Sequence, residues 1–111
     1  MAFKCQFVLA EQYLENKSIV SFGNTRLEVL ATPGHSPGSL SFYSPKDACV
    51  FTGDALFRFD IGRTDLWGGN YEELIHSIQT KLYTLPGETV VYPGHEESSN
   101  IGEEIEYNAY V

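Results

Sequence analysis

Three side chains of types that bind metals stand where a predicted strand runs into a turn. His35 and His95 each follow a Pro-Gly pair, and Asp54 follows a Thr-Gly pair that ends an apolar run. Proline and glycine restrict the shape of a turn, so each side chain is held at a fixed angle. A carboxylate beside apolar residues is costly unless it is paired or binds a metal. Two imidazoles and a carboxylate are a ligand set for zinc or iron.

Each of these positions also has a simpler interpretation. A lone histidine in a turn is more often a surface residue, and a Gly-Asp pair after a strand is often only a turn. The joint occurrence of two Pro-Gly-His sequences with the aspartate favours a metal site. The remaining histidine, His76, falls among polar residues of a predicted helix, and we expect it to be solvated.

The elements that must position these residues are short strands followed by helices. Alternating or continuous apolar residues predict strands over 18–22, 26–32, 39–43, 48–52 and 89–92. An apolar stripe of Tyr71, Leu74, Ile75, Ile78 and Leu82 predicts a helix over 71–82 with Asn70 as its N-cap. A last helix is predicted over 101–108. Residues 53–70, with four glycines, are predicted to be one long functional loop.

Composition and charge exclude several classes of protein. The chain has 111 residues, the length of a single domain, and a net charge of −8 with a pI near 4.6. Such an acidic surface is repelled by phosphate backbones and anionic membranes, so we expect no nucleic-acid or membrane partner. Cys5 and Cys49 form neither a disulfide framework nor a CxxC site. With no signal-peptide or membrane-spanning pattern, a cytoplasmic globular protein is expected.

Four motifs occur in a fixed order along the chain: Thr32–Ser39 (TPGHSPGS), Phe51–Phe57 (FTGDALF), Ile61–Asp65 (IGRTD) and Tyr92–His95 (YPGH). In residues and order they resemble the metallo-β-lactamase-fold hydrolases, particularly the glyoxalase II-like, or hydroxyacylglutathione hydrolase-like, branch. The resemblance covers residues 18–111, while residues 1–17 are expected to be irregular or a short helix. It implies one domain over residues 1–111.

The resemblance assigns roles to the three candidate ligands. It implies that His35 binds a first zinc ion, that Asp54 bridges two metals as the catalytic carboxylate, and that His95 binds the second metal. A metal-activated hydroxide in such proteins attacks a thioester, lactam or phosphoester. Phe57 and Arg63 would contact the substrate, Arg63 through an anionic tail. Alternatively, Arg63 forms an ion pair with Asp65 that ties the loop together.

One family motif is absent. The three histidines leave none for HxHxDH, which supplies the other metal ligands and precedes the matching region. The expected fold class is therefore α/β (α+β): half of an αββα sandwich, with a mainly antiparallel, mixed sheet and two helices. We expect one weak zinc site at most, and little or no hydrolase activity from the chain alone.

Half a sandwich leaves one sheet face without its partner layer. Candidates for that face are Leu27, Val29, Phe42, Val50 and Phe51. Covering it predicts a homodimer, or association with a missing N-terminal half. The acidic residues Glu96, Glu97, Glu103, Glu104 and Glu106 are expected to form a solvated face.

Three functional hypotheses follow from these residues. The first is a zinc-dependent hydrolase whose longer form cleaves a thioester such as an acyl-glutathione. The second is an iron-containing persulfide dioxygenase, whose branch also contains the Gly-Arg-Thr-Asp sequence of residues 62–65. The third is a non-catalytic oligomerising module that keeps the turns only as architecture.

Overall fold

The described part of the chain is built on one mixed sheet. The computed structural model describes residues 19–22, 25–66 and 68–111. Strand order is β1-β2-β3-β4-β7-β8, with β7 parallel to β4 and every other neighbouring pair antiparallel. The strands are β1 (Ile19–Phe22), β2 (Thr25–Ala31), β3 (Leu40–Ser44), β4 (Cys49–Gly53), β7 (Val90–Pro93) and β8 (Ser99–Asn100). The mixed α/β fold is the one expected for half of the sandwich.

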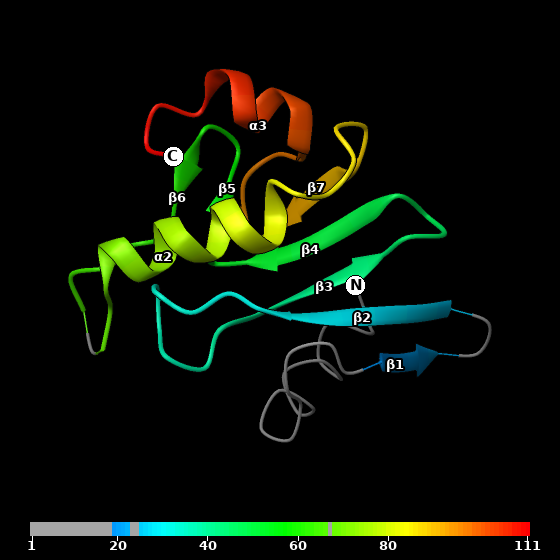
Figure 1. Ribbon diagram of the computed structural model, residues 1–111, viewed down its shortest axis with the longest axis horizontal. Helices are drawn as coiled ribbons and strands as arrows, with labels where there is room; N and C mark the ends of the chain where they lie inside the picture. The colour runs from blue at the N-terminus through cyan, green and yellow to red at the C-terminus, as the bar shows by residue number, and fades with distance from the viewer. Residues whose placement is uncertain (1–18, 23–24, 67) are drawn as a thin grey trace.

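Two helices cover one face of this sheet (Figure 1). Helix α2 (Tyr71–Ser77) continues into a π-helical turn, η1 (Ile78–Leu82), and α3 (Ile101–Tyr107) lies near the C-terminus. Asn70 caps α2 as predicted, because its side chain accepts a hydrogen bond of 2.9 Å from the backbone N–H of Glu73. Apolar side chains of both helices and the sheet form the main core, which includes Leu30, Val50, Leu74, Ile78, Leu82, Val91 and Ile101.

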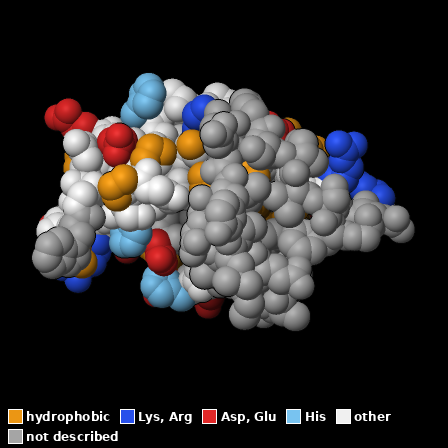
Figure 2. Space-filling view, turned by 90° about the horizontal axis from the view of Figure 1, so that it is seen from below, with side chains coloured by type: hydrophobic (Ala, Val, Ile, Leu, Met, Phe, Trp, Pro, Cys, Tyr) orange, Lys and Arg blue, Asp and Glu red, His pale blue; other side chains and the backbone are white. Residues whose placement is uncertain are grey.

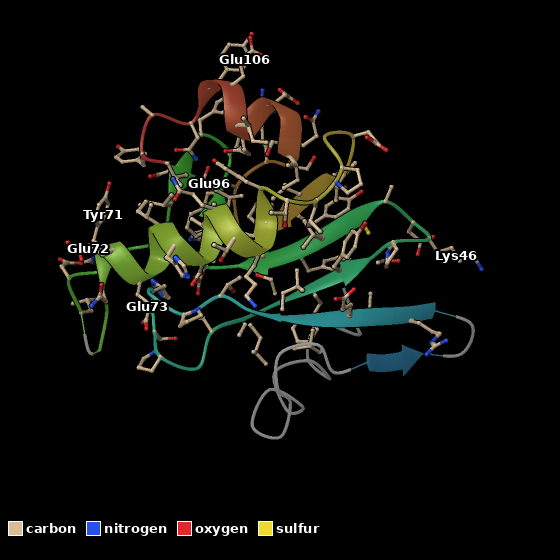
Figure 3. The ribbon with its side chains drawn as sticks, in the orientation of Figure 1. Lys46, Tyr71, Glu72, Glu73, Glu96 and Glu106 are labelled. Atoms are coloured by element: carbon tan, nitrogen blue, oxygen red, sulfur yellow. The ribbon has the colours of Figure 1, made fainter. Side chains whose placement is uncertain are left out.

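Three residues of the predicted helical stripe lie in the core, whereas Ile75 is half-buried and Tyr71 is exposed. Leu74, Ile78 and Leu82 are fully buried, but Tyr71 is 52% exposed. Tyr71 instead donates a hydrogen bond of 3.3 Å to the backbone carbonyl of Tyr110. Its phenol therefore stays at the surface, at the N-terminal end of the helix (Figure 3).

A small hairpin lies inside the segment predicted to be one long loop. Strands β5 (Leu56–Phe57) and β6 (Asp60–Ile61) pair antiparallel across a two-residue turn. Two-residue strands are too short for an alternating pattern to reveal them. The prediction of an unstructured loop over 53–70 is therefore wrong in this part.

The opposite face of the sheet carries a second apolar cluster. Strand pairing places Val29, Phe42, Phe51 and Tyr92 in one row across four strands, and the rings of Phe51 and Tyr92 stack with centroids 5.5 Å apart. Val50 was expected on this face, but it packs beneath the helices. It points the other way because consecutive strand residues alternate between faces.

Some expectations fall on residues without a description. The segment over 1–17, expected to be irregular or a short helix, lies outside the described residues. Among the helices of the described ranges, none is both long and apolar enough to cross a bilayer.

Candidate functional site

An open cleft of about 390 Å³ lies where several strand ends and loops meet. The predicted residues His35, Asp54, Phe57, Arg63 and His95 all line it, together with Asp60, Ile61, Gly62 and Glu96. Figure 2 shows histidine and acidic side chains gathered on one part of the surface. The structure therefore brings every predicted site residue to one place.

The parallel pairing of β4 and β7 brings Asp54 and His95 together. Asp54 follows β4 and His95 follows β7, so both residues lie at the same end of neighbouring parallel strands. A hydrogen bond of 2.7 Å from the backbone N–H of Gly94 to the carbonyl of Gly53 joins the two segments. The pairing register shifts between Phe51 and Gly53. Such irregularities redirect a strand end and are frequent beside functional sites.

His35 reaches the cleft from the turn between β2 and β3. Its Nδ1 lies 2.8 Å from the backbone carbonyl of Arg63, and its Nε2 lies 3.8 Å from Oδ2 of Asp54. Because a carbonyl can only accept, Nδ1 carries the proton in this hydrogen bond. In this tautomer of the uncharged ring, it is the lone pair of Nε2 that faces the Asp54 carboxylate.

The donor set of this pair fits a metal ion. A neutral imidazole nitrogen and a carboxylate oxygen facing each other are both electron-pair donors, and a cation between them would satisfy both. Their separation of 3.8 Å is shorter than the sum of a zinc–nitrogen and a zinc–oxygen bond, about 4.0–4.3 Å. One ion can therefore contact His35 and Asp54 together.

His95 is held differently. Its ring packs on Phe57 with centroids 4.5 Å apart and the ring planes 40° apart, so Phe57 of the β5–β6 hairpin supports the imidazole. Within the described ranges, no group of three or more histidine, cysteine or acidic side chains is arranged to hold a metal ion. His95 thus lines the same cleft as His35 and Asp54, but the three side chains do not form one metal-binding cluster.

The side chain of Arg63 forms the ion pair that was one of its two predicted roles. Its Nε and Nη2 each donate a hydrogen bond of 3.0 Å to the carboxylate of Asp65. Hydrogen bonding from Arg63 lowers the pKa of Asp65, so this carboxylate is ionised at neutral pH. Contact of Arg63 with a substrate stays a prediction.

Four further residues of the cleft were not predicted as site residues. Asp60 and Ile61 belong to the short strand β6, and Gly62 follows it. Glu96, which directly follows His95, adopts a positive φ of 74°. Figure 3 shows it near the β5–β6 hairpin. Ile61 and Gly62 belong to the IGRTD motif, and Asp60 and Glu96 directly adjoin the IGRTD and YPGH motifs. These positions were the signal that could have identified them.

Comparison with known proteins assigns the chain to a family. Residues 10–95 match the metallo-beta-lactamase superfamily. A probable metallo-hydrolase of Bacillus subtilis, YqgX, is 44% identical over 102 residues, which are 92% of this chain and 48% of the relative. The bovine mitochondrial persulfide dioxygenase ETHE1 is 41% identical over 87 residues (78% and 34%). Hydroxyacylglutathione hydrolase GloC of Haemophilus influenzae is 40% identical over 93 residues (84% and 44%).

Solved structures agree with this assignment. The crystal structure of the BLEG-1 B3 metallo-beta-lactamase superposes with a TM-score of 0.83 at 44% identity, covering 87% of this chain and 46% of the other. The di-iron-bound form of TTHA1623 gives a TM-score of 0.80 at 43% identity, covering 88% and 47%. The chain belongs to the metallo-beta-lactamase superfamily, a family of metal-dependent enzymes that includes metallo-hydrolases. It spans about half or less of the length of these relatives.

Proposed function

We propose that the chain carries part of a metal-dependent hydrolase site, in which His35, Asp54 and His95 are the metal ligands. The observation that carries this proposal is the pair of facing donors, His35 Nε2 and Asp54 Oδ2, at 3.8 Å. The hydrogen bond from His35 Nδ1 to a backbone carbonyl supports it, because metal-binding histidines commonly anchor their second nitrogen in this way.

Zinc is the proposed metal, and when bound it would activate a water molecule for attack on a carbonyl group. Asp54 and His35 would hold the ion from one side of the cleft, and His95, which lines the same cleft from the neighbouring strand end, is the proposed ligand of the second metal in the longer protein. Phe57 keeps the His95 ring against the hairpin and adds an apolar wall to the cleft. A thioester such as hydroxyacylglutathione is the proposed substrate of the longer protein, on its likeness to GloC.

The first test is the metal content of the purified chain, measured by elemental mass spectrometry after addition of zinc and dialysis. We expect about one weakly held zinc ion per chain, lost in His35→Ala and in Asp54→Asn. His76→Ala is the matched control, since His76 lies exposed on α2 and does not line the cleft. It should keep the wild-type zinc content.

Two results would contradict the proposal. Zinc that is absent from the wild-type chain, or zinc that persists in both His35→Ala and Asp54→Asn, would show that these donors do not form the site. Absence of zinc together with unchanged thermal stability of His35→Ala and His95→Ala would instead favour the non-catalytic oligomerising module.

A second candidate function is that of an iron-dependent persulfide dioxygenase. The 41% identity to bovine ETHE1 is close to that of the hydrolase relatives, and the structurally similar TTHA1623 binds two iron ions. Metal identity separates the two functions. Preferential iron uptake, with oxygen consumption on a persulfide substrate by the longer protein, would favour the dioxygenase, and zinc with thioester cleavage would favour the hydrolase.

A further inference from the structure

The orientation of His35 depends on a backbone atom of a distant loop. The acceptor of its Nδ1 proton is the carbonyl oxygen of Arg63, 28 positions further along the chain. Should that carbonyl turn away, the ring would be free to rotate or to move its proton to Nε2. Either change would remove the lone pair that faces Asp54.

Backbone contacts hold one end of this loop in place. The N–H of Gly62 donates a hydrogen bond of 3.1 Å to the carbonyl of Ala55. A Cβ atom at position 62 would lie 1.9 Å from the carbonyl oxygen of Asp54 and 3.1 Å from Nδ1 of His35. The chain at Gly62 therefore passes directly against both candidate ligands, and only glycine fits there.

The Arg63–Asp65 ion pair holds the other end. Two parallel hydrogen bonds of 3.0 Å join the guanidinium to the carboxylate two residues further on. A bidentate pair across one intervening residue restricts the backbone between its partners, and the carbonyl of Arg63 lies in that stretch. The pair thus acts on the part of the backbone that binds the His35 ring.

We propose that Arg63 and Asp65 are positioning residues for His35: their ion pair fixes the carbonyl of Arg63 so that the imidazole keeps its proton on Nδ1 and offers Nε2 to the cleft. This inference deepens the proposed metal site and rests on it. It also assigns Arg63 to the loop rather than to an anionic substrate. Two of its nitrogens already bind a carboxylate, and an incoming anion would have to displace Asp65.

The first test measures the tautomer of the His35 ring directly, in the absence of metal. Long-range nitrogen–proton NMR of the chelator-treated full chain distinguishes the two imidazole tautomers. We expect a single Nδ1–H form in the wild type, and a mixture of tautomers with faster exchange of the ring proton in both Arg63→Gln and Asp65→Asn. The double variant should show no greater change than either single variant, because one interaction is lost in all three.

Arg58→Gln is the matched control. Arg58 is also an exposed arginine paired with an acidic residue, Glu97, and it donates to the carbonyl of Ser98, so these two partners lie outside the 62–65 loop. It should leave the His35 ring unchanged. Since the side chains of Arg63 and Asp65 are 64% and 67% exposed, neither substitution opens a cavity, and the variants are expected to fold.

Zinc titration supplies the second readout. Both single variants should bind zinc about 10-fold more weakly than the wild type, the usual effect of losing a residue that orients a ligand. Arg63→Lys should restore part of the affinity, because it keeps the charge but loses the bidentate geometry.

The outcomes separate this inference from the proposed function. A wild-type chain that binds no zinc contradicts the proposed function, yet the tautomer measurement still decides the role of the ion pair. An unchanged His35 ring in both variants overturns the positioning role. Tighter binding of glutathione by Asp65→Asn, with the ring unchanged, would show instead that Arg63 is free to bind anions.

Discussion

Ala48 occupies a backbone conformation that usually belongs to glycine. Its φ is 52°, at the last position of the turn between β3 and β4. The left-handed region costs an alanine roughly 1 kcal/mol, which is comparable to the entropy that glycine loses on folding. The turn is retained because the carbonyl of Ala48 accepts a hydrogen bond of 2.9 Å from Val90, linking it to β7.

We expect Ala48→Gly to leave the free energy of unfolding unchanged or to raise it by about 0.5–1 kcal/mol. At an ordinary strand position the same change would destabilise the chain, as Ala31→Gly in β2 should show by comparison. Urea denaturation followed by circular dichroism measures both variants. Equal losses of stability in the two would mean that Ala48 is not strained.

Burial makes the thiol of Cys49 a poor nucleophile. Desolvation, with a smaller contribution from the nearby carboxylate of Asp47, raises the pKa of Cys49 above its ordinary value. The thiol is therefore protonated at neutral pH, and its thiolate forms only at still higher pH than that of a free cysteine. In a Cys5→Ser background, iodoacetamide should label Cys49 slowly at pH 8 and quickly after denaturation. Fast labelling of the native chain would show that the thiol is accessible.

At the scale of the elements, α3 holds the β5–β6 hairpin through one buried carboxylate. Glu104 is fully buried. Its oxygens accept hydrogen bonds from Phe59 N–H (3.1 and 3.2 Å), Ser99 Oγ (2.6 Å) and Asn108 Nδ2 (2.9 Å). Phe59 lies in the hairpin turn with a positive φ of 58°, so these bonds stabilise a strained backbone. The prediction that Glu104 belongs to a solvated acidic face is wrong.

Replacing this carboxylate by an amide tests its role. Glu104→Gln would place an NH₂ group among three donors and should lower the free energy of unfolding by about 2–3 kcal/mol. Glu106→Gln is the matched control, because Glu106 projects from the exposed side of the same helix (Figure 3). It should change stability little. Similar stability of the two variants in urea denaturation would contradict the buried role of Glu104.

Sequence reasoning was most reliable where an element repeats a pattern over several residues. The strand predicted over 26–32 and the helix beginning at Tyr71 were located because alternation and a helical stripe each extend over many positions. The hairpin was missed because its strands have only two residues each. The burial of Glu104 was missed because it depends on contacts 45 positions apart, such as that with Phe59, which no local pattern records.

In the candidate site too, local sequence patterns indicated some of the groups and could not indicate others. The Pro-Gly-His frames indicated His35 and His95 correctly as residues of one cleft. The carbonyl of Arg63, which fixes the His35 ring, is a backbone group that every residue possesses. Residue identity therefore could not reveal it.

At the scale of the whole molecule, the sheet face opposite the helices bears on how the chain associates. The row Val29, Phe42, Phe51 and Tyr92 crosses this face. Leu27, Val29 and Phe42 are buried, so the expectation that they lie uncovered is wrong, whereas Tyr92 at the end of the row is 43% exposed. We propose that the exposed end of this row, at Tyr92, contacts a second copy of the chain, or the missing N-terminal half expected from the resemblance. Aromatic side chains that are partly exposed at the end of an apolar row are suited to such contacts.

Light scattering after size exclusion tests the association. The wild type should show twice the chain mass of 12.4 kDa, and Tyr92→Lys should shift it to the monomer. Tyr107→Lys, at a 62% exposed tyrosine on α3, is the control and should stay dimeric. A wild type that is monomeric at high concentration would contradict the homodimer, and dissociation in both variants would place the contact elsewhere.

The parallel pairing of β4 with β7 also sets the order in which the molecule can fold. Strands β1 to β4 pair with their sequence neighbours, so this meander needs only short loops to close. Strand β7 reaches β4 only after the cleft loop, the hairpin and α2 have been traversed, and such non-local pairing is slow. We therefore expect the pairing of β7 with β4, which brings His95 into the cleft of His35 and Asp54, to form after the meander.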